Sequence, residues 1–369
     1  MRVAIDARYI REKPSGIGVY VRALVDRIPR AAPGDNFVLW AHPLAPRPLS
    51  HAPNTIDVTV HPGPNSPLTV WWPERYASLD GVDLFHGPHN LMPLGLACAT
   101  VVTVHDLMAI DHPSLHLRGL ERLAKSIYYP QAVWRALVRA RRVIVPTNAT
   151  ADRVRALAPD AASRLRVIWE APDPCFQPAA DRDAARRAAA ALVGSDQPYL
   201  VIVGQNSATK QHDAAIAAFA KGVNPPWRLV LVQRQGRRAT LRRLARQLGV
   251  EPRIVWLPSI SRGDIVTLLQ GAGALIQPSI YEGFGLPIVE AMACGCPVVA
   301  SDIPPFREIA GGAAMLVEDV ERLAWALGEV VGSAELRRSL AQRGLARARE
   351  FSWERCARET LAVYREAAS

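Results

Sequence analysis

The sequence lacks the marks of a membrane-spanning or exported protein. No apolar run approaches the roughly 18 residues that would cross a bilayer, and the opening MRVAIDARYI reads as a strand rather than as a signal peptide. The five cysteines are scattered along the chain, and their odd number without an export signal argues against a disulfide framework. We therefore expect a protein of the reducing cytoplasm.

Patterns for metal and nucleic-acid binding are missing as well. Cys294 and Cys296 stand too close together for a usual zinc pair, so we predict no metal site and no cofactor. The net charge of +10 suits nucleic acid, an anionic membrane surface or a phosphorylated ligand. The arginines are spread over many predicted helices and do not alternate with exposed aromatics, so we expect no nucleic-acid partner.

The length of 369 residues exceeds one ordinary core, and two domains are the natural expectation. Short apolar runs alternate with helical segments in both halves, which predicts α/β domains with parallel sheets. The proline-rich segment APDPCFQPAAD marks an extended connector, so we place the domain boundary near residue 173. The expected strands are 2–6, 37–42, 57–60, 83–87, 101–106, 142–147 and 166–170 in the first half, and 199–205, 228–233, 253–258, 274–279, 297–301 and 314–318 in the second.

The stretch PSIYEGFGLPIVEAMACGCPVVAS, residues 278–301, reads as a loop, a short helix, a turn and a buried strand. Gly283 and Gly285 let the backbone approach a ligand closely. A helix N-terminus behind a glycine-rich loop presents N–H groups and a partial positive charge, which suits a phosphate. Glu282 lies on the loop and Glu290 in the first helical turns, so both can border one pocket while touching different parts of a ligand.

This Glu-x7-Glu string resembles the signature of retaining nucleotide-sugar glycosyltransferases of family 4 (glycosyl transferases group 1), and the resemblance covers nearly the whole chain. It implies the GT-B fold, with two doubly wound Rossmann-like domains facing across a cleft. Residues 1–173 would form the acceptor-side domain and residues 174–351 the nucleotide-sugar-binding domain. The C-terminal helix, residues 352–369, would cross back to the first domain.

The resemblance also implies roles within the Glu-x7-Glu string. Glu290 would accept hydrogen bonds from the two ribose hydroxyls of the donor. Glu282 would bind hydroxyls of the donor sugar and stabilise positive charge on its ring. The residues between them that we expect to bind the donor are Gly283, Phe284, Gly285 and Leu286.

Two further loops are expected to reach the donor diphosphate. The family places an Arg and a Lys after the first strand of the second domain; this chain has Gln205 at about the Arg position and keeps Lys210, to which we assign a catalytic role. Arg234, at the end of the next strand, could supply the missing charge. In the first domain, the glycine turn with Gly16 and Gly18 would add backbone amides, although it is also a plausible tight turn.

Histidines follow two strands of the first domain. VVTVHD resembles the family's His-Asp strand end, so His105 would contact the donor sugar and act in catalysis, and Asp106 beside it would lie on the acceptor side. His86 and His89 end the preceding strand and could line the cleft from the acceptor side. Where the family usually carries Asn-Gly at the hinge, this chain has Glu170 followed by alanine, a departure that could alter the hinge turn.

The helical segment 118–142 combines apolar side chains with seven basic residues. It could rest on an anionic membrane, where lipid-linked acceptors are found, or be an ordinary surface helix with its apolar side in the core. The Trp71-Trp72 pair could stack on an acceptor or simply pack. Peripheral association with the inner face of the membrane therefore stays open beside a purely cytoplasmic location.

The resemblance implies a retaining, metal-independent front-face transfer of a hexose from a nucleotide-diphosphate sugar. Its pattern is most like that of bacterial enzymes of surface-polysaccharide synthesis, many of them mannosyltransferases, which favours GDP-mannose as donor and a glycan, a lipid-linked molecule or a small hydroxyl compound as acceptor. The alternatives are a non-catalytic scaffold or partner subunit of the same fold, and another GT-B enzyme such as a sugar-nucleotide epimerase.

Overall fold

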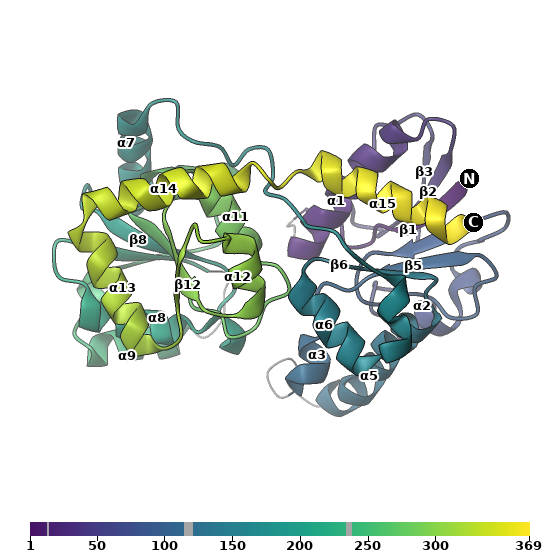
Figure 1. The fold of residues 1–369 in the computed structure, drawn as a ribbon, viewed down its shortest axis with the longest axis horizontal. Coiled ribbons are helices and arrows are strands. Elements are labelled where there is room, and N and C mark those ends of the chain that lie inside the picture. The colour runs from purple at the N-terminus through teal and green to yellow at the C-terminus, as the bar shows by residue number, and fades with distance from the viewer. Residues whose placement is uncertain (13–14, 114–120, 234–237) are drawn as a thin grey trace. The chain divides into compact units, whose positions relative to one another are not determined.

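The computed structural model describes residues 1–12, 15–113, 121–233 and 238–369. The chain forms two compact units (Figure 1). Unit 1 comprises Met1–Ala171 and Ser352–Ser369, and unit 2 comprises Pro172–Phe351. Each unit is built on a parallel sheet covered by helices, so the predicted α/β class with two doubly wound sheets is confirmed. Within the described residues, no helix combines the length and the apolar character needed to span a bilayer.

Unit 1 contains a seven-stranded sheet in the order β3-β2-β1-β4-β5-β6-β7. Its strands are apolar and mostly buried on both faces, as expected for a parallel sheet between helices. They are β1 (Arg2–Asp6), β2 (Asn36–Ala41), β3 (Thr55–Thr59), β4 (Leu84–Gly87), β5 (Ala99–Thr103), β6 (Arg142–Val145) and β7 (Leu165–Val167).

The strand order of unit 1 reverses between β1 and β4. From β1 the chain proceeds through β2 to β3 on one side, and from β4 through β5 and β6 to β7 on the other. β1 and β4 are direct neighbours, with Ile5 in register with His86. In doubly wound sheets, ligands bind outside the carboxyl ends of the strands at such a switch point.

Two of the longer helices of unit 1 begin at polar caps. Ser15 accepts a hydrogen bond from the Gly18 amide at 3.1 Å before the first long helix, and Thr147 caps another through the Thr150 amide. The helical segments are α1 (Gly16–Ala31), α2 (Pro67–Trp71), η1 (Pro73–Arg75), α3 (Met108–Asp111), α5 (Glu121–Arg139), α6 (Asn148–Leu157), η2 (Pro159–Arg164) and α15 (Trp353–Ala368).

Helix α15 completes unit 1 although it follows unit 2 in the sequence. It packs against α1 and against β4, β5 and β6 (Figure 1). Its fully buried Tyr364 hydroxyl lies 2.6 Å from Nδ1 of His86, whose Nε2 lies 2.8 Å from Thr103 Oγ1. Arg365 also pairs with the buried Asp35 at 2.6 Å. Apolar packing and this buried hydrogen-bonded chain therefore hold the helix in place.

We expect Tyr364→Phe to lower the free energy of unfolding by about 1–3 kcal/mol, because it leaves a buried ring nitrogen of His86 without its partner. Tyr128→Phe is the matched control: its hydroxyl is buried with no hydrogen-bond partner within the described part of the chain, so its removal should be neutral or stabilising. Urea unfolding of both variants measures the difference. Equal effects would show that the Tyr364 hydroxyl adds nothing to stability.

Unit 2 contains a six-stranded parallel sheet in the order β10-β9-β8-β11-β12-β13. Here the strand order reverses between β8 and β11, which are neighbours. All thirteen strands of the two sheets fall on runs predicted from the sequence. The strands of unit 2 are β8 (Tyr199–Val203), β9 (Arg228–Val232), β10 (Ile254–Leu257), β11 (Ala274–Gln277), β12 (Val298–Ser301) and β13 (Met315–Val317).

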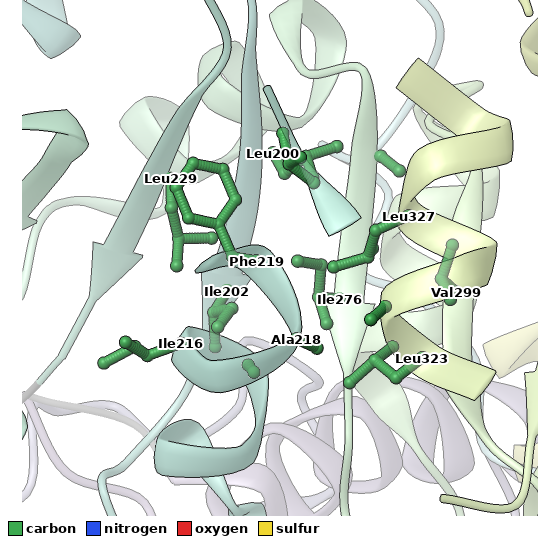
Figure 2. Packing of buried hydrophobic residues seen from close by; sticks show 14 of the residues in the cluster. Leu200, Ile202, Ile216, Ala218, Phe219, Leu229, Ile276, Val299, Leu323 and Leu327 are labelled. Carbon is green, nitrogen blue, oxygen red and sulfur yellow. The ribbon is translucent and has the colours of Figure 1, made fainter. Parts of the chain in front are cut away.

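A hydrophobic core of unit 2 lies between the sheet and helices that include α8 and α13. Figure 2 shows Phe219 of α8 and Leu323 and Leu327 of α13 among strand residues such as Leu200 and Ile276. All five side chains are buried. The helical segments of unit 2 are α7 (Arg182–Val193), η3 (Ala208–Lys210), α8 (His212–Gly222), α9 (Arg238–Gln247), η4 (Glu251–Arg253), α10 (Arg262–Gly271), α11 (Leu286–Ala293), α12 (Pro304–Ala310), α13 (Val320–Gly332) and α14 (Ala334–Ala348).

Candidate active site

The switch point of unit 2 brings two predicted site residues together. Lys210 ends η3, in the loop that follows β8, and Glu282 lies in the loop that follows β11. The ammonium of Lys210 forms an ion pair with Oε1 of Glu282. The two side chains are 22% and 15% exposed, so both can still be reached from solvent. The backbones of these loops are also joined, because the Ile280 amide donates to the Thr209 carbonyl at 2.9 Å.

Two residues that the sequence analysis missed orient Glu282. Ser279 Oγ donates to Glu282 Oε1 at 2.9 Å, and Gln277 Nε2 donates to the same oxygen at 3.2 Å. Gln277 also donates to Ser279 Oγ at 2.9 Å. Both residues are buried polar groups at the carboxyl end of β11, and that position was the available signal. Three donors converge on one carboxylate oxygen, which fixes the carboxylate before any ligand arrives.

The glycine-rich loop leads directly into α11. Gly285 has a φ of 113°, and a Cβ atom there would lie 2.8 Å from the ring of Phe306, so only glycine fits. Phe284 is buried, with its ring edge-on to Phe351 at a centroid distance of 5.9 Å. Leu286 is the first residue of α11. The helix N-terminus therefore lies at the end of the loop that carries Glu282, as the motif predicted.

Glu290 lies on α11, in a partly buried environment with charged neighbours. Burial raises the pKa of its carboxyl to about 8; the positive charge of Arg262 opposes this rise and the negative charge of Asp173 adds to it. Arg262 and Asp173 themselves form an ion pair. Glu290 is thus a predicted site residue whose protonation state changes near pH 8.

Three further donor contacts were predicted in unit 2, at Gln205, Gly283 and Arg234. Gln205 is exposed in the loop after β8, where its carbonyl accepts from the Ser207 amide at 2.9 Å. Gly283 lies half-buried between Glu282 and Phe284. Arg234, proposed as a substitute charge, lies outside the described residues. Their contacts with a donor stay predictions.

His105 is buried in unit 1 with both ring nitrogens bonded. Nδ1 donates to Glu170 Oε1 at 2.8 Å and Nε2 donates to the Pro88 carbonyl at 3.0 Å. Burial acts to lower the pKa of His105, but the hydrogen bond and charge of Glu170 outweigh it and raise that pKa above its usual value. Glu170, at the position where the family carries Asn, therefore serves as the carboxylate partner of His105. The predicted contact between His105 and the donor sugar stays a prediction.

The pair of His105 and Glu170 makes the stability of unit 1 depend on pH. Because the pKa of His105 is raised in the folded state, the pair stabilises fully below pH 6.5, and this contribution is lost as the pH rises through the folded pKa. We expect Glu170→Gln to lower the free energy of unfolding by about 1.5–3 kcal/mol at pH 6 and by clearly less at pH 9. Denaturant unfolding at the two values measures this. A cost that does not change with pH would contradict the charged pair.

The remaining histidines of the HGPHN segment have different environments. His86 is fully buried, and burial lowers its pKa to about 3, so it is a neutral residue in the packing of α15. His89 is buried at the carboxyl end of the sheet, where its Nε2 lies 2.8 Å from Asp6 Oδ2. Asn90 links this loop to the next strand end, because it donates to the Asp106 carbonyl at 3.0 Å. The acceptor-side roles of His86, His89 and Asp106 stay predictions.

The glycine turn before α1 is set by local contacts. Gly16 is exposed at the helix N-terminus, and Gly18 is buried. A Cβ atom on Gly18 would lie 2.7 Å from the Tyr9 carbonyl oxygen, so the close approach of these segments requires glycine. The amide of Gly18 already donates to Ser15. A contact of this turn with a diphosphate would therefore depend on Gly16 more than on Gly18.

Two solved structures resemble the whole chain. Sucrose-phosphate synthase from Thermosynechococcus elongatus is 24% identical, with a TM-score of 0.79 over 100% of this chain and 99% of that one. The Anabaena protein HepE, solved in complex with UDP-glucose, is 18% identical, with a TM-score of 0.71 over 99% of each chain. These likenesses establish the GT-B fold.

Two family descriptions match the sequence, one over each half: Glycosyltransferase Family 4 over residues 14–174 and Glycosyl transferases group 1 over residues 185–347. Together with the fold and the site of unit 2, they define a glycosyltransferase that uses nucleotide sugars. The chain belongs to family 4 of the retaining glycosyltransferases, the glycosyl transferases group 1. The resemblance noted in the sequence is thereby confirmed.

Two relatives show how far this similarity extends. O-antigen chain mannosyltransferase B of Escherichia coli is 26% identical over 300 residues, which are 76% of this chain and 74% of that protein. D-inositol 3-phosphate glycosyltransferase of Mycolicibacterium smegmatis is 33% identical over 287 residues, 74% of this chain. The match spans 63% of the length of the inositol enzyme.

Proposed function

We propose that the chain transfers a hexose, with mannose from GDP-mannose favoured, to a hydroxyl group of a glycan, a lipid-linked molecule or a small compound, with retention of configuration. The observation that carries this proposal is the ion pair of Lys210 and Glu282 at the switch point of unit 2, on the loop that leads into α11. Ligands bind at switch points in doubly wound folds. A cation and a helix N-terminus at one such point suit a diphosphate.

Lys210 and α11 would stabilise the leaving group. As the bond between the sugar and the diphosphate breaks, negative charge grows on the β-phosphate, and fixed positive potential nearby lowers the barrier. The diphosphate would compete with Glu282 for the Lys210 ammonium. Glu282, kept in place by Ser279 and Gln277, would then be free to accept hydrogen bonds from hydroxyls of the donor sugar.

Glu290 would bind the ribose of the nucleotide. A carboxylate can accept hydrogen bonds from two neighbouring hydroxyls. Glu290 lies on α11, beyond the loop that would meet the phosphates, so it would reach a different part of the donor. In a front-face reaction, the acceptor oxygen attacks the anomeric carbon on the side from which the diphosphate departs. The leaving phosphate oxygen takes the acceptor's proton, so no separate base is required.

The relatives support two different choices of donor and acceptor. The name of the Escherichia coli relative favours mannose transfer to a surface polysaccharide, whereas the UDP-glucose complex of the Anabaena protein makes a uridine nucleotide the main competitor. The inositol enzymes add a small phosphorylated acceptor as an alternative.

Peripheral membrane association is part of the proposal. Unit 1 exposes three tryptophans: Trp71 at the end of α2, Trp72 directly after it, and Trp134 on α5. The guanidinium of Arg135 lies 4.9 Å from the centroid of the Trp71 ring. Exposed tryptophans with arginine suit the interface of an anionic membrane. Residues 118–120 of the predicted basic helix lie outside the described residues. Flotation with vesicles that contain anionic lipid, against neutral vesicles, tests this part.

The experiment that tests the proposal is thermal unfolding of the full chain with GDP, UDP, ADP and their sugar conjugates. A ligand that binds only the folded protein stabilises it by about 2.7 kcal/mol at a hundredfold excess over its Kd. We expect GDP and GDP-mannose to give the largest rise in Tm. On longer incubation, we expect GDP to be released from GDP-mannose. A larger rise of Tm with UDP would show that the donor is a uridine-diphosphate sugar and not GDP-mannose. No rise with any nucleotide would refute the assignment of the site.

A further inference from the structure

Helix α9 presents a group of arginines on the surface of unit 2. The helix packs beside α8 (Figure 1), and its apolar side is buried in the core of the unit. Arg238, Arg242 and Arg246 recur every fourth residue, so they follow one another along one face of the helix. Arg243 lies next to this row, three positions before Arg246. The side chains of Arg242, Arg243 and Arg246 are exposed to solvent.

The charge of α9 differs from that of its neighbours. Its residues Arg238–Gln247 include four arginines and no acidic side chain. Every other described α-helix of unit 2 that has a basic residue also contains an aspartate or a glutamate. No ion pair within the described part of unit 2 involves the four arginines of α9. The positive charge of this helix is therefore not matched by ion pairs within the described chain.

The spacing of the arginines works against the helix. Like charges three or four positions apart on a helix repel each other and destabilise it. Arg242 stands four positions from both Arg238 and Arg246, and Arg243 stands three positions from Arg246. A partner with several negative charges would relieve this repulsion, because each guanidinium would then face an anion. The arginines of α9 are therefore suited to an anionic surface.

Trp256 holds two of the guanidiniums in place. It lies on β10, the edge strand of the sheet. The guanidinium of Arg238 lies 5.8 Å and that of Arg242 lies 5.5 Å from the centroid of its ring, which is within the range of cation–π attraction. Arg238 also donates a hydrogen bond to the Trp256 carbonyl. Arg238 is thus tied to the strand, whereas Arg242 is positioned by the ring and still exposed.

An exposed leucine directly follows the arginines. Leu248 stands in the turn after α9 and is 41% exposed. Arginines beside an exposed apolar side chain suit a lipid surface, where guanidiniums meet the headgroups and the apolar group reaches the acyl boundary. A single-stranded nucleic acid would instead favour aromatic side chains that stack on its bases, and the exposed residues of α9 include no aromatic. The surface therefore favours a membrane over a nucleic acid.

We propose that α9 is an electrostatic contact between unit 2 and a membrane that contains anionic phospholipid. Arg242, Arg243 and Arg246 bind the phosphates of the headgroups, and Leu248 enters the boundary of the acyl chains. This inference rests on the membrane association proposed above and goes beyond it, because that association was drawn from the tryptophans of unit 1. It gives a lipid contact of its own to the unit that carries the donor site.

Sedimentation of the full chain with vesicles tests the contact. The anionic vesicles contain two parts phosphatidylcholine to one part phosphatidylglycerol, and vesicles of phosphatidylcholine alone are the neutral reference. The variant combines Arg242→Gln, Arg243→Gln and Arg246→Gln, since glutamine is also a good helix former. We expect its partition coefficient on anionic vesicles to fall by about a hundredfold, roughly fivefold for each arginine. Added salt should weaken wild-type binding. An unchanged partition coefficient would overturn the proposal.

The matched control removes three arginines from α7. Arg182, Arg186 and Arg187 are also exposed, but Asp181 caps this helix and Asp183 lies in its first turn. Replacing the three arginines with glutamine lowers the net charge by the same amount as the α9 variant. We expect this control to bind anionic vesicles nearly as well as the wild type, and both variants to keep its melting temperature. Equal losses of binding in the two variants would show that only the overall charge matters, which contradicts the proposal.

The remaining outcomes separate this proposal from its rival and from the proposed function. If the wild type binds an oligonucleotide through α9 and does not bind the anionic vesicles, the partner is a nucleic acid and the proposal is wrong. If no nucleotide raises the melting temperature but vesicle binding depends on α9, the donor site is wrong and the membrane contact stands. If nucleotides bind and vesicle binding does not depend on α9, only the membrane contact of unit 2 is wrong.

Discussion

We expect Lys210→Ala to lower kcat for sugar transfer by about a hundredfold to a thousandfold, the usual effect of removing one charged group that stabilises a transition state. Lys210 is the cation that the structure places at the switch point of unit 2, paired with Glu282. Since the charge it would meet grows as the diphosphate departs, the loss should fall mainly on kcat. KM for the nucleotide sugar should rise less.

Lys221→Ala is the matched control for this prediction. Lys221 lies in α8, 62% exposed, with a surface ion pair to Glu321 at 3.3 Å. Exposed pairs contribute little to stability, so this variant should keep its activity and its melting temperature. Steady-state rates of nucleotide release, measured for both variants, decide the question. A Lys210→Ala enzyme with unchanged kcat would remove Lys210 from the site.

The second large effect is expected at Glu290. We expect Glu290→Ala to raise the Kd for the nucleotide by at least about tenfold to a hundredfold, because hydrogen bonds between a charged group and the ribose hydroxyls contribute about 1.5–3 kcal/mol. Isothermal titration with GDP or UDP at pH 9 measures this. Glu321→Ala, on the exposed surface of α13, is the control and should bind normally. Normal binding by Glu290→Ala would refute the ribose assignment.

The pH dependence of binding separates the charge of Glu290 from its size. Because burial raises its pKa to about 8, the ionised fraction falls about tenfold for each pH unit below that value. If the carboxylate is the binding form, the Kd of the wild type should tighten as the pH rises from 6 towards 8 and level off above it. Glu290→Gln should show a flat profile. The same slope in both proteins would assign the dependence to another group.

Much of the fold follows from simple patterns. Runs such as YLVIV and VVTV are apolar on both faces, and only a parallel sheet covered by helices on both sides buries them in this way, so the strands could be placed from the sequence. The site of unit 2 was predictable in part. Glu282 and Glu290 belong to one local string, and the turn at Gly285 is set by residues within it.

The partners of these residues could not be predicted, because they come from distant parts of the chain. Lys210 and Glu282 are 72 positions apart, and Glu170 lies 65 positions from His105. The HGPHN segment shows the limit most clearly. His86 and His89 are three positions apart. His86 is nevertheless buried against Tyr364, which lies 278 positions away, whereas His89 is bonded to Asp6 at the edge of the sheet. The two histidines therefore differ because of Tyr364 on α15 and Asp6 on β1, which neither histidine's own segment reveals.

The placement of α15 in unit 1 also constrains the order in which the chain folds during synthesis. Unit 2 is continuous, so it can fold as soon as residue 351 has left the ribosome. Unit 1 must wait for residues 352–369, with β4, β5 and β6 meanwhile uncovered where α15 will pack. A chain that ends after residue 351 would therefore carry a complete unit 2 tethered to a unit 1 without α15, a product that exposes apolar surface to chaperones and proteases.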